Sequence, residues 1–170
     1  MTQPASNYIS QDIHRRLRSQ AWRVWIVTAL VVLVWVGSIV AAPLLGLSSV
    51  YGFFSYACHQ IPDRSLHLDG HSLAVCTRCF GVYFGLFAGV LIYPVWRPIE
   101  EIEPIRRFWL FLSLVPVTID WSLTMFGIWE NTHVSRFLTG MVLGVACATF
   151  IVPALVEITR NFSTRKLQTQ

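Results

Sequence analysis

Four long apolar runs dominate the chain, and short polar segments separate them. The runs cover approximately residues 22–45, 73–95, 108–128 and 137–156. Each is long enough to cross the hydrocarbon core of a bilayer, which takes about 20 apolar residues in a helix. None shows the polar face that a helix of a water-soluble bundle would carry. The pattern predicts an all-α, polytopic membrane protein with four transmembrane helices in a compact bundle.

The segments around these runs complete the predicted organisation. Residues 1–20 are expected to form a cytoplasmic basic segment, in which Ile9, Ile13 and Leu17 share one face of a short amphipathic helix. Residues 21–158 are expected to form the transmembrane domain, with a Cys/His-rich outer connection at 51–79. Residues 159–170 are expected to form a cytoplasmic tail.

Composition and charge agree with a membrane location. The chain is 54% hydrophobic and only 13% charged, with a mean hydropathy of +0.54, which is typical of membrane proteins rather than soluble domains. The net charge of +4 does not indicate nucleic-acid binding, because the basic residues lie at the ends of the apolar runs instead of forming one patch.

The distribution of basic residues predicts the orientation. Ten of them flank the runs on the side of the two termini: Arg15, Arg16, Arg18, Arg23, Arg97, Arg106, Arg107, Arg160, Arg165 and Lys166. Three lie on the other side: Arg64, Arg78 and Arg136. Because cytoplasmic loops are enriched in Lys and Arg, both termini are expected in the cytoplasm. The connection 51–79 then faces outward from a bacterial-type inner membrane.

Glycines recur at four-residue intervals in two of the runs. They are Gly81, Gly85 and Gly89 in the second run, and Gly140 and Gly144 in the fourth. Small residues at this spacing let helix backbones approach closely in lipid. The second and fourth runs are therefore expected to pack inside the bundle, and the same glycine-lined faces are candidate contacts with other membrane subunits.

Candidate chemistry is concentrated in one connection. Three of the four cysteines lie there, Cys58 alone and Cys76 with Cys79 as a CxxC pair. Two cysteines at this spacing, with a third about twenty residues away, suit tetrahedral zinc. The fourth ligand is open between histidines. His71 has a convenient separation from Cys76, and His67 is a second candidate, whereas His59 follows Cys58 directly and would more easily orient a ligand or water.

Two other interpretations of the cysteines stay open. On the oxidising side of a membrane, a CxxC beside a third cysteine could exchange disulfides. Alternatively, Cys58 could form a structural disulfide with Cys76 or Cys79, which would leave one thiol over. No haem-attachment motif accompanies the pair, because CTRCF lacks the histidine of C-x-x-C-H, and no nucleotide-binding signature is present.

A second polar feature lies inside the third run. Asp120 is an ionisable residue at membrane depth, and such a residue normally has a partner or a function. Its expected partner is Arg136 or Arg78. Alternatively, Asp120 faces the cysteines as an oxygen ligand, a proton acceptor or an anchor for a ligand, and Asn131 lines the same mouth.

The run CHQIPDRSLHLDGHSLAVCTRCFGVYFG carries a resemblance. It resembles the signature of domain of unknown function 2085, a family of small bacterial and archaeal membrane proteins, at these positions: Cys58, His59, Gln60, Pro62, Arg64, Ser65, Cys76, Arg78, Cys79, Gly81 and Tyr83. NTHVSRFLTG resembles the family's later segment at Asn131, Arg136, Thr139 and Gly140. The resemblance implies a shared fold and a shared site but no established activity, and it favours His59 over His71.

Three functions follow as hypotheses. The first is a membrane protein whose zinc clamps the connection onto the bundle, serving as a structural or accessory subunit of a membrane complex. The second is a metal-dependent enzyme acting on a lipid or polyprenyl head group, with Asp120 or His59 as general base and Arg64, Arg78 or Arg136 binding phosphate. The third is a membrane thiol–disulfide oxidoreductase.

Overall fold

The computed structural model describes residues 5–103, 105–128 and 130–168, with side chains described between residues 14 and 162 of those ranges. The α-helices are α1 (Ala5–Leu45), α2 (Ser48–Phe54), α3 (Thr77–Trp96), α4 (Phe108–Met125) and α5 (His133–Gln168). Between α2 and α3 lie a single 3-10 turn, η1 (Pro62–Arg64), and an antiparallel hairpin of β1 (His67–Leu68) and β2 (His71–Ser72).

Four of the helices are long and apolar enough to cross a membrane. They are His14–Leu45 of α1, Thr77–Trp96, Phe108–Met125, and His133–Phe162 of α5. Their outward faces carry large apolar side chains, such as Val34 on α1, which is 70% exposed, and Val95 on α3, which is 88% exposed. Such surfaces are stable where lipid covers them. The predicted all-α, four-span architecture is confirmed, and the protein is a multi-pass membrane protein.

Several helix ends differ from the sequence-based expectation. The basic N-terminal segment continues into the first span without a break, so both belong to α1; the side chains of Ile9 and Ile13 lie outside the described residues. At the other end of the chain, α5 runs through to Gln168. The second span begins at Thr77 instead of near residue 73, because the apolar segment 73–75 is buried beneath α1 and α2 instead of starting the helix.

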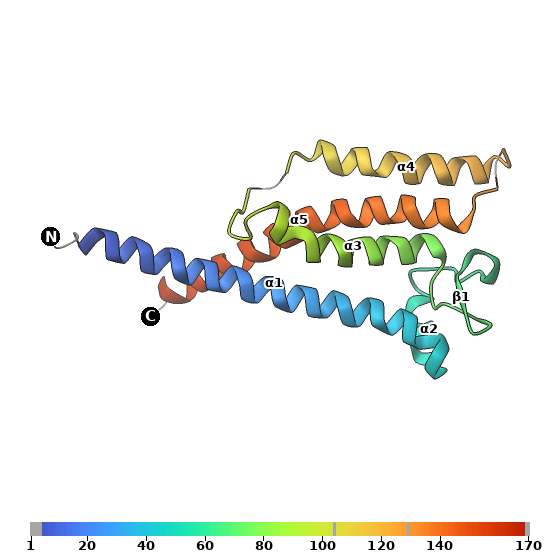
Figure 1. Ribbon diagram of the computed structural model, residues 1–170, viewed down its shortest axis with the longest axis horizontal. Coiled ribbons are helices and arrows are strands. Elements are labelled where there is room, and N and C mark those ends of the chain that lie inside the picture. The colour runs from blue at the N-terminus through green and yellow to red at the C-terminus, as the bar shows by residue number, and fades with distance from the viewer. Residues whose placement is uncertain (1–4, 104, 129, 169–170) are drawn as a thin grey trace.

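The helices α3 and α5 form the centre of the molecule (Figure 1). A Cβ atom at Gly81 or Gly85 would overlap the backbone of α5, and one at Gly140 or Gly144 would overlap the backbone of α3. The glycines therefore allow these two backbones to touch, as expected from their spacing. The other expectation for them, contact with further subunits, stays a prediction; within the chain, the glycines of α3 and α5 pack against each other's backbones.

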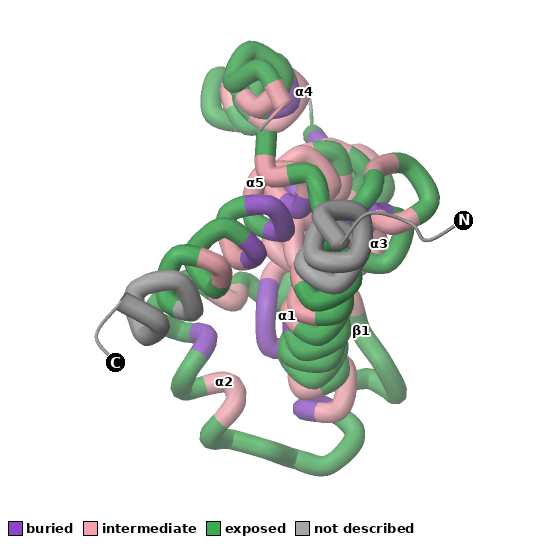
Figure 2. Tube along the Cα trace, turned by 90° about the vertical axis from the view of Figure 1, so that its left-hand side faces the viewer, coloured by how far each residue is buried: buried purple, intermediate pink, exposed green. Residues whose placement is uncertain are grey.

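The remaining long helices flank this pair. Both α3 and α5 contact α1, whereas α4 packs on α5. Figure 2 shows the outer turns of α1 exposed, with buried residues where α1, α3 and α5 meet. Both termini and the connection 97–107 lie at one end of the bundle (Figure 1). The opposite end, called the cysteine end below, holds α2, η1, the hairpin and the connection from α4 to α5.

Candidate metal centre

Three cysteine sulfurs converge at the cysteine end. Cys58 follows α2, Cys76 directly precedes α3, and Cys79 lies in the first turn of α3. Their Sγ atoms all lie within 4.8 Å of one another. All three thiols are free, with Cys58 buried and the other two half-buried. The fourth cysteine, Cys147, lies on α5 and is not part of this group.

Gln60 holds the segment after Cys58 in place. Its backbone adopts a φ of +50°, in the left-handed region, which turns the chain sharply. Its side-chain Nε2 donates to the carbonyl oxygens of Tyr51, at 2.7 Å, and Ala74, at 2.8 Å. The second of these bonds ties the segment that carries Cys58 to the segment that carries Cys76. A side chain between these cysteines in the sequence thus holds their backbones together.

A tight hairpin then returns the chain to α3. Asp69, with φ +49°, and Gly70, with φ +79°, form the two-residue turn between β1 and β2, and two positive φ values are characteristic of a type I′ turn. The hydroxyl of Tyr51 donates to the carbonyl oxygen of Ser72 at 2.5 Å, which fixes the hairpin to α2. The hairpin thereby positions the start of α3, where the CxxC pair lies.

The surroundings of Cys58 favour its thiolate. A hydrogen bond from the thiol of Cys76, and a weaker one from the thiol of Cys79, lower the pKa of Cys58 well below its ordinary value. Burial of Cys58 acts in the opposite direction and raises this pKa, but its effect is smaller. The backbone N–H of Cys76 also donates to Cys58 Sγ at 3.2 Å. That N–H lies at the start of α3, where the helix dipole is positive. The thiolate is the form of cysteine that binds metal.

The sulfurs line a cavity of about 450 Å³ at the cysteine end. Three arginines from different elements share its lining: Arg64 from η1, Arg78 from α3 and Arg136 from α5. Trp121 and Met125 of α4 contribute an apolar wall. The structure therefore places three cysteine sulfurs, three guanidinium groups and an apolar surface around one space.

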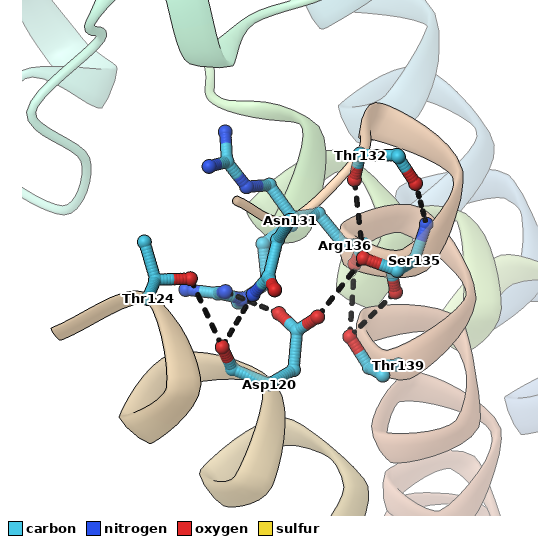
Figure 3. A network of polar contacts seen from close by, with 8 residues as sticks. Asp120, Thr124, Asn131, Thr132, Ser135, Arg136 and Thr139 are labelled. Carbon is cyan, nitrogen blue, oxygen red and sulfur yellow. Dashed lines mark hydrogen bonds and ion pairs between the residues drawn. The ribbon is translucent and has the colours of Figure 1, made fainter. Parts of the chain in front are cut away.

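Asp120 is the centre of a polar network (Figure 3), and two of its partners, Arg78 and Thr124, line this cavity. Its carboxylate forms an ion pair with Arg78 and accepts a hydrogen bond from Ser135 Oγ at 3.0 Å. Its backbone carbonyl accepts hydrogen bonds from the Asn131 side chain and from Thr124 Oγ1. The Asp120 side chain is only 7% exposed, so its charge is compensated by Arg78 within the protein. Of the two partners expected for Asp120, the structure pairs it with Arg78.

The histidines proposed as a fourth ligand lie in different places. His59 lines the cavity beside the cysteines. His71 lies on β2, where its Nδ1 is 3.0 Å from the carbonyl oxygen of Asp69, and with His67 it lines a separate cavity of about 550 Å³. Within the described residues, the group whose ligand atoms meet the 4.8 Å spacing contains the three cysteines alone.

One contact at the site had no signal in the sequence. Thr77, fully buried between the two cysteines of the CxxC, donates from Oγ1 to the carbonyl oxygen of Arg64 at 3.0 Å. The Oγ1 atom of Thr77 also lies 3.0 Å from Nδ1 of His133 at the start of α5. Thr77 therefore connects η1, α3 and α5. The role of Gln60 could have been suspected from its place in the Cys-His-Gln run, but a lone threonine forms no pattern.

Comparison with known proteins identifies relatives of this arrangement. The family described as "Predicted membrane protein (DUF2085)" matches residues 58–150, which contain all three cysteines. An uncharacterized protein of Methanocaldococcus jannaschii is 34% identical over 109 residues, covering 64% of this chain and 70% of the relative. An uncharacterized protein of Methanothermobacter thermautotrophicus is 34% identical over 95 residues, covering 56% and 84% respectively. No solved structure matches the chain.

Proposed function

The chain belongs to the DUF2085 family of membrane proteins, and we propose that it binds one zinc ion through Cys58, Cys76 and Cys79, with a fourth coordination position open to the cavity. The observation that carries this proposal is the convergence of three sulfurs on the wall of a space large enough for a small molecule.

The spacing of the sulfurs suits the metal. Zn–S bonds of about 2.3 Å in a tetrahedron place the sulfurs about 3.8 Å apart, and the three Sγ atoms lie within 4.8 Å of one another. Zinc is favoured over harder cations because thiolates are soft ligands. The start of α3 adds positive potential beside Cys58, whose Sγ accepts a hydrogen bond from the backbone N–H of Cys76.

The fourth position distinguishes a structural from a reactive site. Structural zinc sites are closed by four protein ligands, whereas catalytic sites keep three and an exchangeable position. His59 lines the same cavity, which supports a role in approaching the metal or in orienting a water bound to it. Zinc at such a position lowers the pKa of bound water or polarises a ligand oxygen. The geometry therefore supports a metal site of the catalytic type better than a closed structural clamp.

The accessory-subunit hypothesis receives less support. Its candidate contact faces were the glycine stripes, and these are used between α3 and α5. Thiol–disulfide exchange remains a second candidate, since three free thiols within 4.8 Å are also what exchange requires.

The proposed location is an inner membrane, with both termini in the cytoplasm and the cysteine end outside. Both termini lie at the end of the bundle opposite the cysteines (Figure 1). The excess of basic residues at the end with the termini supports this orientation.

One experiment separates these functions. Protein purified in detergent without reductant or chelator is assayed for zinc and for free thiols in the same sample. We expect about one zinc per chain, absent in Cys58→Ser, Cys76→Ser and Cys79→Ser but retained in the control Cys147→Ser. Replacement by Co²⁺ should give a spectrum that shifts when imidazole is added, because an open position accepts it. A metal-free protein with two thiols blocked until reduction would instead support a disulfide.

A further inference from the structure

We propose that the cavity binds a phosphate-bearing ligand, and that Arg64 and Arg136 hold its phosphate at the open position of the metal. The inference rests on the proposed zinc site and assigns it a class of ligand. It also gives the three arginines of the cavity different roles: Arg78 supports the fold, whereas Arg64 and Arg136 bind the phosphate.

The three arginines differ in their partners. Arg78 is committed to Asp120, which compensates its charge. Within the described part of the chain, no ion pair involves Arg64 or Arg136, although both line the cavity. The side chain of Arg64 is exposed and that of Arg136 half-buried. Two cationic groups thus share a cavity whose described lining contains no carboxylate.

The charge of the cavity calls for an anion. Three thiolates and Zn²⁺ together carry a charge of −1, and the Arg78–Asp120 pair is neutral. Arg64 and Arg136 then leave the site with a net charge of +1. Like charges near one another in a partly desolvated cavity destabilise each other, so an anionic ligand between them is favoured.

The shape of the groups specifies the anion further. Guanidinium groups bind phosphate oxygens through paired N–H donors in a planar fork, which makes arginine suited to phosphate recognition. Arg64 comes from η1 and Arg136 from α5, so one phosphate can bridge two elements that otherwise meet through Thr77.

The size of the cavity indicates more than a bare phosphate ion. A volume of about 450 Å³ lies within the range of small-molecule sites. Trp121 and Met125, which line it, are 54% and 70% exposed and provide an apolar surface beside the arginines. A phosphoester, whose charged group meets the arginines and whose organic part meets α4, fits this division.

The test uses zinc-loaded full-length protein in a maltoside detergent, which contains no phosphate. Binding of inorganic phosphate and of a short-chain phosphatidic acid is measured by calorimetry, and zinc content is measured on each sample. We expect Arg64→Gln and Arg136→Gln each to weaken binding about tenfold to a hundredfold, the effect of losing a charge-assisted hydrogen bond, with zinc unchanged. Arg106→Gln, which removes a charge at the opposite end, should bind as the wild type does.

The two phosphate probes distinguish the source of the ligand. Arginine-dependent binding of phosphatidic acid alone supports a lipid head group, whereas equal binding of inorganic phosphate supports a soluble phosphate compound. Zinc retained with no binding of either probe, or equal weakening in Arg106→Gln, would overturn the inference and leave the metal site standing. A wild-type protein that takes up no zinc would instead refute the proposed function.

Arg64→Lys keeps the charge but removes the fork. If bidentate recognition is used, its affinity for the probe should fall between those of the wild type and Arg64→Gln. An affinity equal to that of Arg64→Gln would also support the fork, whereas an unchanged affinity would overturn it.

Discussion

Arg78 on α3 forms an ion pair with Asp120 on α4, and this pair joins two membrane-spanning helices that otherwise pack against α5 rather than against each other. The side chain of Asp120 is 7% exposed and that of Arg78 is 23% exposed. The pair therefore attaches α4 to the centre of the bundle, through an arginine that lines the cavity of the candidate metal centre.

Removing one partner of this pair should destabilise the protein strongly. We expect Asp120→Asn to lower the free energy of unfolding by about 3–5 kcal/mol, because Arg78 is left buried without a counter-charge. Denaturation in mixed detergent micelles measures the loss. The apolar double variant Arg78→Met/Asp120→Leu should be more stable than Asp120→Asn. Thr118→Ala, an exposed change on the same helix, should cost less than about 0.5 kcal/mol. A double variant that is no more stable than Asp120→Asn would contradict this account.

The interface between α3 and α5 should be intolerant of a single added methyl group. In Gly144→Ala the new Cβ would overlap the carbonyl oxygen of Val82, so the helices must separate. We expect a loss of about 1–3 kcal/mol in the free energy of unfolding, as for other overpacked positions. Gly37→Ala on α1 is the matched control, since a Cβ there meets no atom within 4 Å. Equal stability of the two variants would show that the backbones are not in contact.

Gln60 should control the affinity for zinc without being a ligand. Gln60→Gly keeps the left-handed backbone but loses both hydrogen bonds, each worth about 0.5–1.5 kcal/mol. Zinc affinity, measured by competition with a chelator, should therefore fall by roughly tenfold to a hundredfold. Gln60→Ala should bind more weakly still, because a side chain with a Cβ is strained at φ +50°. Asp63→Ala, an exposed change on η1, serves as the control. If Gln60→Gly bound zinc as tightly as the control, the hydrogen bonds of Gln60 would have no role in zinc binding.

The proposed orientation can be measured directly. Green fluorescent protein fused after Gln170 should fluoresce, and alkaline phosphatase at the same position should be inactive, because both reporters would lie in the cytoplasm. A phosphatase fusion after Ile128, at the cysteine end, should be active. The opposite pattern would place the metal centre in the cytoplasm and would contradict the count of basic residues.

The sequence predicted the spans and the main helix pair because both depend on local patterns. Hydropathy identifies a helix that lipid covers, and glycines four residues apart identify a backbone contact. Hydropathy could not place the start of α3. Leu73, Ala74 and Val75 are apolar because they are buried against other residues of the protein, and hydropathy cannot distinguish such burial from contact with lipid.

Some features of the candidate site could likewise be predicted from local sequence patterns, and others could not. The CxxC spacing brought Cys76 and Cys79 together, and the third cysteine was expected beside them. The position of His71 could not be predicted, because its separation from Cys76 along the chain says nothing of the hairpin that directs it to another cavity. The choice of Arg78 over Arg136 as the partner of Asp120 likewise depends on the packing of α3, α4 and α5, which no local pattern encodes.

The order of these parts along the chain has a consequence for how the protein is made. Cys58, Cys76 and Cys79 lie close together in sequence, and the bonds of Gln60 and Tyr51 that position them are equally local. Arg136 lies on α5, the last span, and is therefore synthesised after the three cysteines. During synthesis, the three sulfurs can therefore come together once α3 has entered the membrane, whereas the cavity is completed only when α5 docks. On the proposed function, a nascent chain would bind metal before it could bind a phosphate-bearing ligand.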